Sequence, residues 1–439
     1  MKTFRPIAVG LSVLAFTAIS VSEAQSLRDT YNESIRYTGD IDFPQRIGAR
    51  GDVDRGRRAF GFADDGVTQD PTEALFSGDS LIAGHVESNG RTCATCHRGE
   101  AGLFLGLPPL PLHSTIPFTD VLFTGLRADV GDDPDGLPNF DNLGLLLHRP
   151  TRLDPLFSPS DPRRQVFFWR STNRLINTVF GFGFLHDGRM RQLVETTRGA
   201  VFTHTQDFDL RFDDITNAPM EDKNRRLLDI SAFMEDTIDP PELKALLDPN
   251  DPDYHRLSSD PFATVPISTH EQRDGSRVFK KFCMDCHNMP NVFLNRDHVN
   301  NPPEATPPPY GHTFDIGVSQ RNFHNLEFRR FDVPTGTRVP ILLPLAKQDG
   351  STVTITVVDD IGLASATGRY EDLHKFKVPQ LRRISQLGPY FHDNSAATLE
   401  EVVDYFNGPL YNSSLDGRDH PIHLSPGQRS ALLAFLRIL

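Results

Sequence analysis

Every cysteine of the chain lies in one of two copies of the same short pattern. The 439-residue sequence has four cysteines, and they occur in Cys93-Ala-Thr-Cys96-His97 and Cys283-Met-Asp-Cys286-His287. Two thiols at this spacing can form thioethers with the vinyl groups on one side of a porphyrin, and the adjacent histidine can then reach the iron. We therefore predict two covalently bound haem c groups, with His97 and His287 as the proximal ligands.

Two other chemistries use pairs of cysteines at this spacing. The pairs could share one zinc ion or act as redox dithiols. Neither role requires a histidine directly after each second cysteine, and this chain has one in both places, His97 and His287. The repeated histidine therefore favours haem.

The first residues have the pattern of an export signal. Lys2 and Arg5 form a basic start, residues 7–20 are mostly apolar, and Ser22-Glu-Ala24 has the small-x-small pattern of a cleavage site. We predict a signal peptide over residues 1–24, cleaved after Ala24, and a periplasmic mature protein. An uncleaved anchor is the alternative. No later stretch is apolar enough to span a bilayer, so we expect no stable membrane insertion.

The charge of the chain limits its partners. The formal net charge is -13, which argues against nucleic acid and against an anionic membrane surface. An acidic face suits a small basic redox protein. The expected partners are a small periplasmic electron-donor cytochrome or cupredoxin, or a protein substrate, and a homodimer is left open.

The chain contains a weak internal repeat. A Gly-x-x-x-Phe pattern precedes each haem motif, at Gly56 and at Gly275, and an aromatic segment with His-Asp follows each, at His186 and at His392. Two matched halves predict two similar haem domains. We assign them to residues 25–238 and 261–439, joined by a linker over 239–260.

Local signals favour a mainly α fold. Capping patterns and apolar periodicity predict helices over residues 271–283, from Leu399 to a stop at Gly408, and over 426–438. In the second of these, the helical period places Phe406, and not Tyr405, on the buried face. Residues 339–358 are rich in β-branched side chains and predict a hairpin. The expected architecture is therefore two cytochrome c-like haem domains with long ordered loops and a small β-hairpin.

From about Gly51 to the C-terminus the sequence resembles the bacterial di-haem cytochrome c peroxidase family, which includes the MauG-type enzymes. The residues that carry the resemblance are Arg170-Ser-Thr-Asn-Arg-Leu-Ile-Asn177, His186-Asp-Gly-Arg189, Cys286-His-Asn-Met-Pro290, Ile316-Gly317-Val318, Phe376-Lys-Val-Pro379-Gln-Leu381-Arg382, Gly388-Pro-Tyr-Phe-His392-Asp393 and Thr398-Leu-Glu-Glu-Val-Val403. The resemblance implies that the haem at His97 is the reaction site and that the haem at His287 relays electrons to it.

The resemblance also suggests sixth iron ligands. His113 follows the first motif at the spacing of the histidine that caps the reactive iron in many family peroxidases. For the relay iron many members use a methionine, but the last methionine here is Met289. Phe406 occupies that position, and its neighbour Tyr405 is the candidate, because tyrosine serves in the quinone-maturing branch. His374, His392 or an open site are the alternatives.

The reactive pocket departs from the family pattern. Family peroxidases place a Gln and a Glu after the Asp-Gly-Arg element, where this chain has Thr196 and Gln206. Neither side chain is a good general base near pH 7. Glu195 and His204 are close in sequence and are further catalytic candidates. The family tryptophan that lies between the haems is replaced by His186.

Two further cofactor contacts are expected. Arg382 and Lys377 are predicted to reach haem propionates, because a buried propionate favours a paired cation. The resemblance implies a Ca²⁺ ion between the domains, although no carboxylate cluster has loop-type calcium spacing.

Three functions fit this sequence. The first is an enzyme that reduces hydrogen peroxide with electrons from a small cytochrome. The second is an enzyme that oxidises a protein or organic substrate through a high-valent di-haem state, which the missing methionine favours. The third is a pure electron-transfer cytochrome, which the missing Gln and Glu favour.

Overall fold

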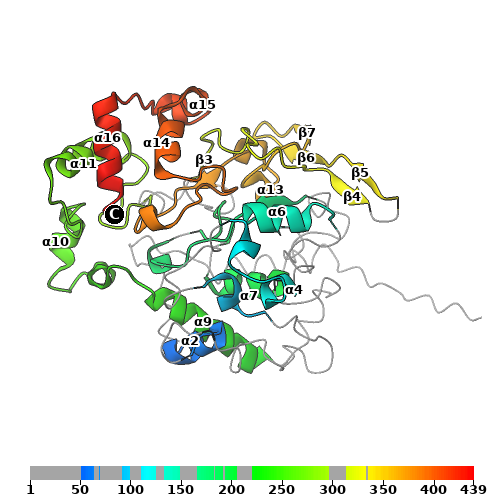
Figure 1. Ribbon diagram of the computed structural model, residues 1–439, viewed down its shortest axis with the longest axis horizontal. Coiled ribbons are helices and arrows are strands. Elements are labelled where there is room, and N and C mark those ends of the chain that lie inside the picture. Colours follow the sequence, from blue (N-terminus) through cyan, green and yellow to red (C-terminus); the bar gives the residue numbers. More distant parts are fainter. Residues whose placement is uncertain are drawn as a thin grey trace, which may run out of the picture. The chain divides into compact units, whose positions relative to one another are not determined.

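The computed structural model describes most of the chain after residue 50, and Figure 1 gives its ribbon. The described residues are 51–63, 69, 91–98, 110–124, 133–148, 166–181, 183–190, 193–204, 220–295, 313–332 and 335–439. The predicted signal peptide lies outside them. Helices are the main elements, as predicted, and none of the described helices is long and apolar enough to cross a membrane.

The first half is built on a close pair of helices, α2 (Val53–Phe60) and α9 (Met220–Asp236), which lie side by side in Figure 1. A Cβ atom on Gly56 would lie 1.9 Å from the backbone oxygen of Asp229, so only glycine allows this approach. Phe60, one turn further, is buried against Phe233 of α9. The Gly-x-x-x-Phe pattern is therefore a helix-crossing motif.

The second half repeats this pair with α11 (His270–Phe282) and α16 (Pro426–Leu436). A Cβ atom on Gly275 would lie 1.9 Å from the backbone oxygen of Ala431, and Phe279 is fully buried against Phe435. The observed bounds confirm the helices predicted over 271–283 and 426–438. Each half thus has a glycine at the matching position, where the helix that precedes a haem motif packs against a later helix.

This crossing gives a stability prediction. Gly275→Ala should destabilise the protein by about 1–3 kcal/mol, because the new methyl group overlaps the backbone of α16 and forces the helices apart. Gly427→Ala, in α16 itself, is the matched control, since no atom lies within 4 Å of its added Cβ. Denaturant unfolding of the two variants should separate them, and equal stabilities would show that the crossing tolerates a side chain.

A second repeated feature is the His-Asp turn. Leu185 and Phe391 have the same positive φ of 68°, and both turns close with an antiparallel bridge, Phe184 to Met190 and Tyr390 to Ala396. In each turn the aspartate after the histidine accepts a 3.2 Å hydrogen bond from the backbone N–H two residues on. The turns lead into α7 (Leu193–His204) and α14 (Leu399–Asn407).

The described residues also form four antiparallel strand pairs. They are β1 (Leu146–His148) with β2 (Phe168–Arg170), β3 (Thr313–Phe314) with β8 (Phe376–Lys377), β4 (Arg330–Asp332) with β5 (Thr337–Val339), and β6 (Leu342–Ala346) with β7 (Thr352–Thr356). The pair β6–β7 confirms the predicted hairpin. The other three pairs were not predicted, because strands of two or three residues are too short to show an alternating pattern.

The remaining elements are short. They are α3 (Cys93–Cys96), η3 (Leu112–Ser114), α4 (Val121–Thr124), α6 (Gly136–Leu143), η6 (Thr178–Phe180), η7 (Pro241–Leu247), α10 (Tyr254–Ser259), α13 (Ala364–Thr367), η8 (Tyr370–Asp372), η9 (Ile384–Gln386), α15 (Pro409–Ser413) and η10 (Gly417–Asp419). The stretch 239–260, predicted as a linker, contains η7 and α10, and its residues Leu243 and Leu257 pack in an apolar cluster with Val292.

A large apolar cluster contains residues of both sequence halves. Trp169 of β2 and Leu147 of β1 pack with Leu343 and Leu345 of β6 and with Ile361. The buried face of the predicted hairpin is therefore covered by strands of the first half. This contact helps hold the residues that follow β2 against those that follow β7.

Candidate haem sites and their surroundings

The first cysteine motif forms a single helical turn, α3, which Thr92 and Thr95 cap reciprocally. Its thiols face two different apolar walls. Cys93 packs against the cluster that contains Phe60 and Leu193, and Cys96 belongs to the cluster of Leu112, Leu122, Phe140 and Leu146. A haem attached to both sulfurs would lie between these walls.

His97 presents an imidazole that fits an iron ligand. Its ring lies 6.0 Å from that of Phe60, and its Nδ1 atom is buried with no hydrogen-bond partner among the described residues. Burial, with a smaller contribution from His204, lowers the pKa of His97 to about 4. The ring is therefore neutral near pH 7, which is the form that binds a metal.

The second motif follows α11 directly, and Cys283 is the C-cap of that helix. The Nδ1 atom of His287 lies 2.7 Å from the backbone oxygen of Phe293, so Nδ1 donates and Nε2 is the basic nitrogen. Burial lowers the pKa of His287 to about 4. A backbone hydrogen bond of this kind fixes the ring orientation of a metal-binding histidine. His287 thus has an orienting partner that His97 lacks.

The described residues do not form the shared zinc site of the first alternative. All four cysteines lie in the described residues, and none of them forms a disulfide bond there. The described part of the chain contains no group of three or more His, Cys, Asp or Glu side chains that could hold a metal ion. The two motifs do not come together to share one ion.

Three cations of low exposure have no ion-pair partner in the described part of the chain: Arg382 is buried, and Arg174 and Lys377 are partly buried. Arg382 donates from Nε to the backbone oxygen of Asn291 at 2.5 Å and from Nη2 to Thr264 Oγ1, and burial lowers its pKa to about 10. Burial also lowers the pKa of Arg174 to about 10, and none of the described residues accepts a hydrogen bond from its Nη1 atom. Lys377 donates to the backbone oxygen of Gly183 at 2.9 Å, and burial lowers its pKa to about 8.

Such cations are costly to bury unless an anion approaches them. Haem propionates are anions of the right kind, and Arg and Lys are their usual hydrogen-bond donors in proteins. The surroundings of Arg382 and Lys377 therefore fit the predicted propionate contacts, and Arg174 is a third candidate that sequence reasoning missed. Arg174 could have been found from the sequence, because it lies in the Arg170–Asn177 segment that carries part of the family resemblance.

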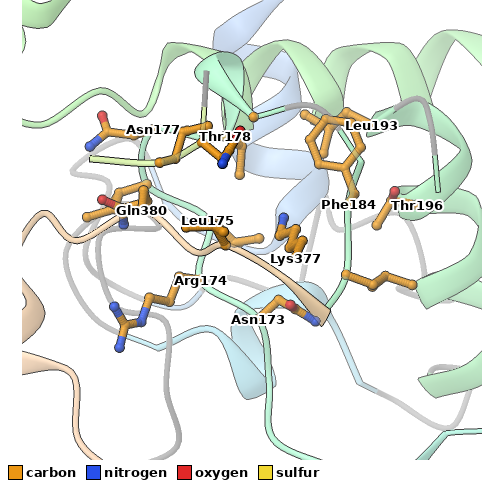
Figure 2. Close-up of a pocket in the computed structure, with 16 residues that line it drawn as sticks. Asn173, Arg174, Leu175, Asn177, Thr178, Phe184, Leu193, Thr196, Lys377 and Gln380 are labelled. Carbon is orange, nitrogen blue, oxygen red and sulfur yellow. The ribbon is translucent and has the colours of Figure 1, made fainter. Parts of the chain in front are cut away.

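Figure 2 shows a pocket lined by residues of both halves. Among them are Asn173, Arg174, Phe184, Thr196, Lys377 and Gln380. The structure therefore brings Thr196, a predicted catalytic residue, to the same pocket as Lys377, a predicted haem contact. His204 lies at the end of the same helix, α7, and is half-buried. Gln206 and the side chain of Glu195 lie outside the described residues.

No family model matches the chain, but individual proteins are similar to it in sequence. The cytochrome c peroxidase IdrP2 of Denitromonas iodatirespirans is 28% identical over 286 residues, which is 62% of this chain and 69% of that protein. The methylamine utilization protein MauG of Methylorubrum extorquens is 39% identical over 67 residues, which is 15% of this chain and 19% of MauG. These relatives support the di-haem cytochrome c peroxidase and MauG family as the family that this chain resembles. The chain is a peroxidase-like oxidoreductase.

Among solved structures, the di-haem peroxidase BthA from Burkholderia thailandensis matches with a TM-score of 0.39 and 17% identity, over 84% of this chain and 88% of that chain.

Within this family, His113 is the predicted sixth ligand of the reactive iron. It lies in η3, next to Leu112, which packs in the cluster of Cys96. Its Nδ1 atom is 2.6 Å from Asp141 Oδ2, and its half-exposed ring stacks on Phe118. The carboxylate leaves Nε2 as the nitrogen that could bind iron, and the ligand role stays a prediction.

The prediction that Phe406, and not Tyr405, lies on the buried face of α14 is wrong. The side chain of Tyr405 is buried, at 6% exposure, whereas Phe406 is only partly buried. The reason is that α14 is covered on two sides: Leu399 and Val403 face one cluster, and the segment 313–318 covers the other side. The Tyr405 hydroxyl donates to the backbone oxygen of Ile316 at 2.7 Å, and burial raises the pKa of this hydroxyl well above its ordinary value.

Replacing Tyr405 by Phe tests its predicted iron contact. If Tyr405 binds the relay iron, the substitution should change the absorption and EPR spectrum of the low-spin haem. The lost hydrogen bond to Ile316 should also cost about 1 kcal/mol of stability. Phe406→Leu is the control, because it alters the neighbouring ring without removing a ligand atom. Spectra that match the wild type for Tyr405→Phe would remove it from the ligand candidates.

The other two candidate ligands of the relay iron have protein partners. Both ring nitrogens of His374 are engaged, at 2.7 Å by Gln320 and at 2.9 Å by Asp359. The Nε2 atom of His392 lies 3.6 Å from Asp360, and its ring stacks on Phe376 with centroids 4.2 Å apart.

His186, at the position of the family tryptophan, lies where the two halves meet. Its Nε2 donates to the backbone oxygen of Ser171 at 2.9 Å, and its ring centroid is 6.4 Å from that of His392. His392 in turn stacks on Phe376. These three rings form a chain from the first half into the second. Trp169, the single tryptophan, is instead buried in the apolar cluster of β1, β2 and β6.

Proposed function

We propose that the protein is a periplasmic di-haem c-type enzyme that reduces hydrogen peroxide. In this proposal electrons pass from the haem at His287 to the haem at His97, and a small cytochrome or cupredoxin supplies them. The main support is the placement of two haem motifs behind matching helix crossings, together with a chain of neighbouring rings, His186, His392 and Phe376, between the halves.

The residues present fit two haem groups. Each motif has a partly buried imidazole whose pKa is lowered to about 4, and the cations Arg382, Arg174 and Lys377 could bind haem propionates. When bound, the haem at His97 would supply the iron that binds peroxide and the electrons that cleave its O–O bond. The chain itself contributes the thiols that fix the ring, the orienting hydrogen bond on His287, and a pocket wall that excludes water. A Ca²⁺ ion, which the resemblance implies, stays a prediction.

Oxidation of a protein or organic substrate is the second candidate. It is favoured by the absence of any methionine after Met289, because oxygen or nitrogen ligands stabilise higher oxidation states of haem iron better than a thioether does. Tyr405, buried in α14, supplies such an oxygen next to the position that a methionine would occupy.

Mixing the purified protein with hydrogen peroxide in a stopped-flow spectrometer tests the proposal. The as-isolated and half-reduced forms should be compared. A fast haem intermediate that decays with oxidation of an added reduced cytochrome supports peroxide reduction. An intermediate that persists in the presence of reduced cytochrome favours oxidation of another substrate. Absence of any spectral change in both forms leaves only the electron-transfer alternative.

A further inference from the structure

Two short segments, one from each half, cross to the His-Asp turn of the other half. The backbone N–H of Ser171 donates to the backbone oxygen of His392 at 2.7 Å. The backbone N–H of Lys377 donates to the backbone oxygen of His186 at 3.0 Å. Ser171 and Lys377 each lie 15 residues before the histidine of their own turn. The two halves therefore exchange equivalent hydrogen bonds, as in an approximate two-fold arrangement.

The same repeat makes Arg174 equivalent to Gln380, because each lies 12 residues before the histidine of its own turn. Three residues later the backbone conformation is also shared. Asn177 has a φ of 58° and Arg383 a φ of 54°, and each precedes a short 3-10 helix, η6 or η9. Arg174 and Gln380 line the one pocket of Figure 2 from opposite halves.

This pocket collects hydrogen-bond donors that lack acceptors. The Nη1 atom of Arg174 and the Nε2 atom of Gln380 are buried, and neither has a partner among the described residues. Lys377, whose Nζ atom donates to the backbone oxygen of Gly183 at 2.9 Å, lines the same pocket. Buried donors are nearly always paired, and two cations beside an amide donor suit an anion with several acceptor atoms. A carboxylate has this chemistry.

The pocket adjoins the first haem site. Leu175, Phe184 and Leu193 line it, and the same three residues pack in the apolar cluster that contains Cys93. The Nζ atom of Lys377 lies 5.9 Å from the centre of the Phe184 ring. The second half thus brings its donors to the wall against which the first cysteine of α3 packs.

We propose that Lys377, Gln380 and Arg174 form one carboxylate-binding site, and that it holds a propionate of the haem attached beside His97. The first haem site would then be incomplete without two side chains of the second half. This inference rests on the two haem groups of the proposed function, but not on peroxide reduction. It also implies that residues of the second half set the reduction potential of the haem in the first, because charge and hydrogen bonds near a haem tune its potential.

Gln380→Glu should distinguish a filled site from an empty one by the sign of its effect. Its Oε1 atom accepts the backbone N–H of Arg382 at 2.7 Å, and a glutamate keeps that acceptor. A bound propionate would repel the new carboxylate, so the denaturant midpoint of the holoprotein should fall and the haem propionate band in resonance Raman spectra should shift. Without a bound carboxylate the glutamate would pair with Arg174 and Lys377, and the midpoint would rise. Gln386→Glu, exposed in η9, is the matched control and should change neither reading.

Lys377→Met should lower the reduction potential of the haem at His97. Loss of a nearby positive charge disfavours the ferrous state, which carries one more electron. A redox titration of the full-length holoprotein, followed by absorbance, measures this shift. Lys244→Met removes an exposed ammonium that pairs with Asp236 at 2.7 Å, and both potentials should stay at their wild-type values.

The affected haem can be identified in a protein that keeps only one. With Cys93 and Cys96 replaced by alanine, the haem at His287 remains, and Lys377→Met should then leave its potential unchanged. A shift of that haem instead would place the carboxylate site on the second haem and overturn the assignment.

A free carboxylate is the other source of the same chemistry. Potentials measured in acetate and in chloride buffers should agree if a propionate fills the site, whereas a dependence on acetate would assign the site to a free carboxylate. An unchanged Raman band and potential in both Gln380→Glu and Lys377→Met, or a higher midpoint for Gln380→Glu, would refute the propionate contact. If the wild-type protein carries no haem at His97, the proposed function fails first, so the two failures can be told apart.

Discussion

Replacing Cys93 and Cys96 together by alanine is expected to remove one of two haems and to leave the other in place. The two thiols lie against different apolar walls, and without thioethers nothing covalent would hold a porphyrin between them. Replacing Cys283 and Cys286 together by alanine should remove the other haem. Intact mass, haem staining and ferrous absorbance should each report one haem in either double variant and none in the fourfold variant.

The same series separates haem from its alternatives. The four cysteines are the only thiols in the chain, so no other residue can take over the attachment. Iron analysis should follow the haem absorbance, and zinc should be absent from the wild type. If either double variant kept the mass and absorbance of the wild type, the corresponding motif would not attach haem.

Local sequence predicted the parts of the protein that depend on few neighbours. The haem motifs follow from spacing, and the repeat of Gly56 and Gly275 predicted two similar halves. The structure adds that each glycine lies at a helix crossing. The hairpin followed from β-branched residues and a turn. The His-Asp turns have matching φ values at Leu185 and Phe391, so the repeated sequence adopts the same backbone conformation in both halves.

Features that depend on distant segments could not be predicted in this way. Tyr405 is buried because residues 313–318 cover α14, and no pattern within α14 reveals that cover. β1 is a strand of three residues whose alternation is visible only once Leu146 and Leu147 are seen in different clusters. The partner of Arg170, Asp360, lies 190 positions away and in the other half.

Arg170 should be one of the most sensitive positions for stability. Its side chain is 1% exposed and lies between two buried carboxylates. It donates from Nε and Nη2 to both oxygens of Asp360, at 2.6 and 2.7 Å, and from Nη1 to Asp187 at 2.7 Å. Arg170→Met should cost about 3–5 kcal/mol, because it leaves two buried carboxylates with too few partners.

Two comparisons make this result specific. Arg429→Met removes an equally short pair with Asp404 at the surface, and should cost no more than about 1 kcal/mol. Combining Arg170→Met with Asp360→Leu should recover part of the loss, because the stranded charge is removed along with its partner. Denaturant unfolding measures all of these variants. A cost for Arg170→Met as small as that for Arg429→Met would mean that water reaches the network.

The pH dependence gives an independent check on the same network. Burial alone would raise the pKa of Asp187, but the guanidiniums of Arg189 and Arg170 outweigh it, and its pKa lies below the ordinary value. The pKa of Asp360 is also lowered, where Arg170 again outweighs burial. A carboxylate with a depressed pKa in the folded state stabilises the protein above its unfolded pKa, and this contribution is lost as the pH falls through the folded value. The stability difference between wild type and Arg170→Met should therefore be constant near neutral pH and shrink below about pH 4. A difference that stayed the same down to strongly acidic pH would indicate that the loss comes from packing, because only the charged network is sensitive to protonation of Asp187 and Asp360.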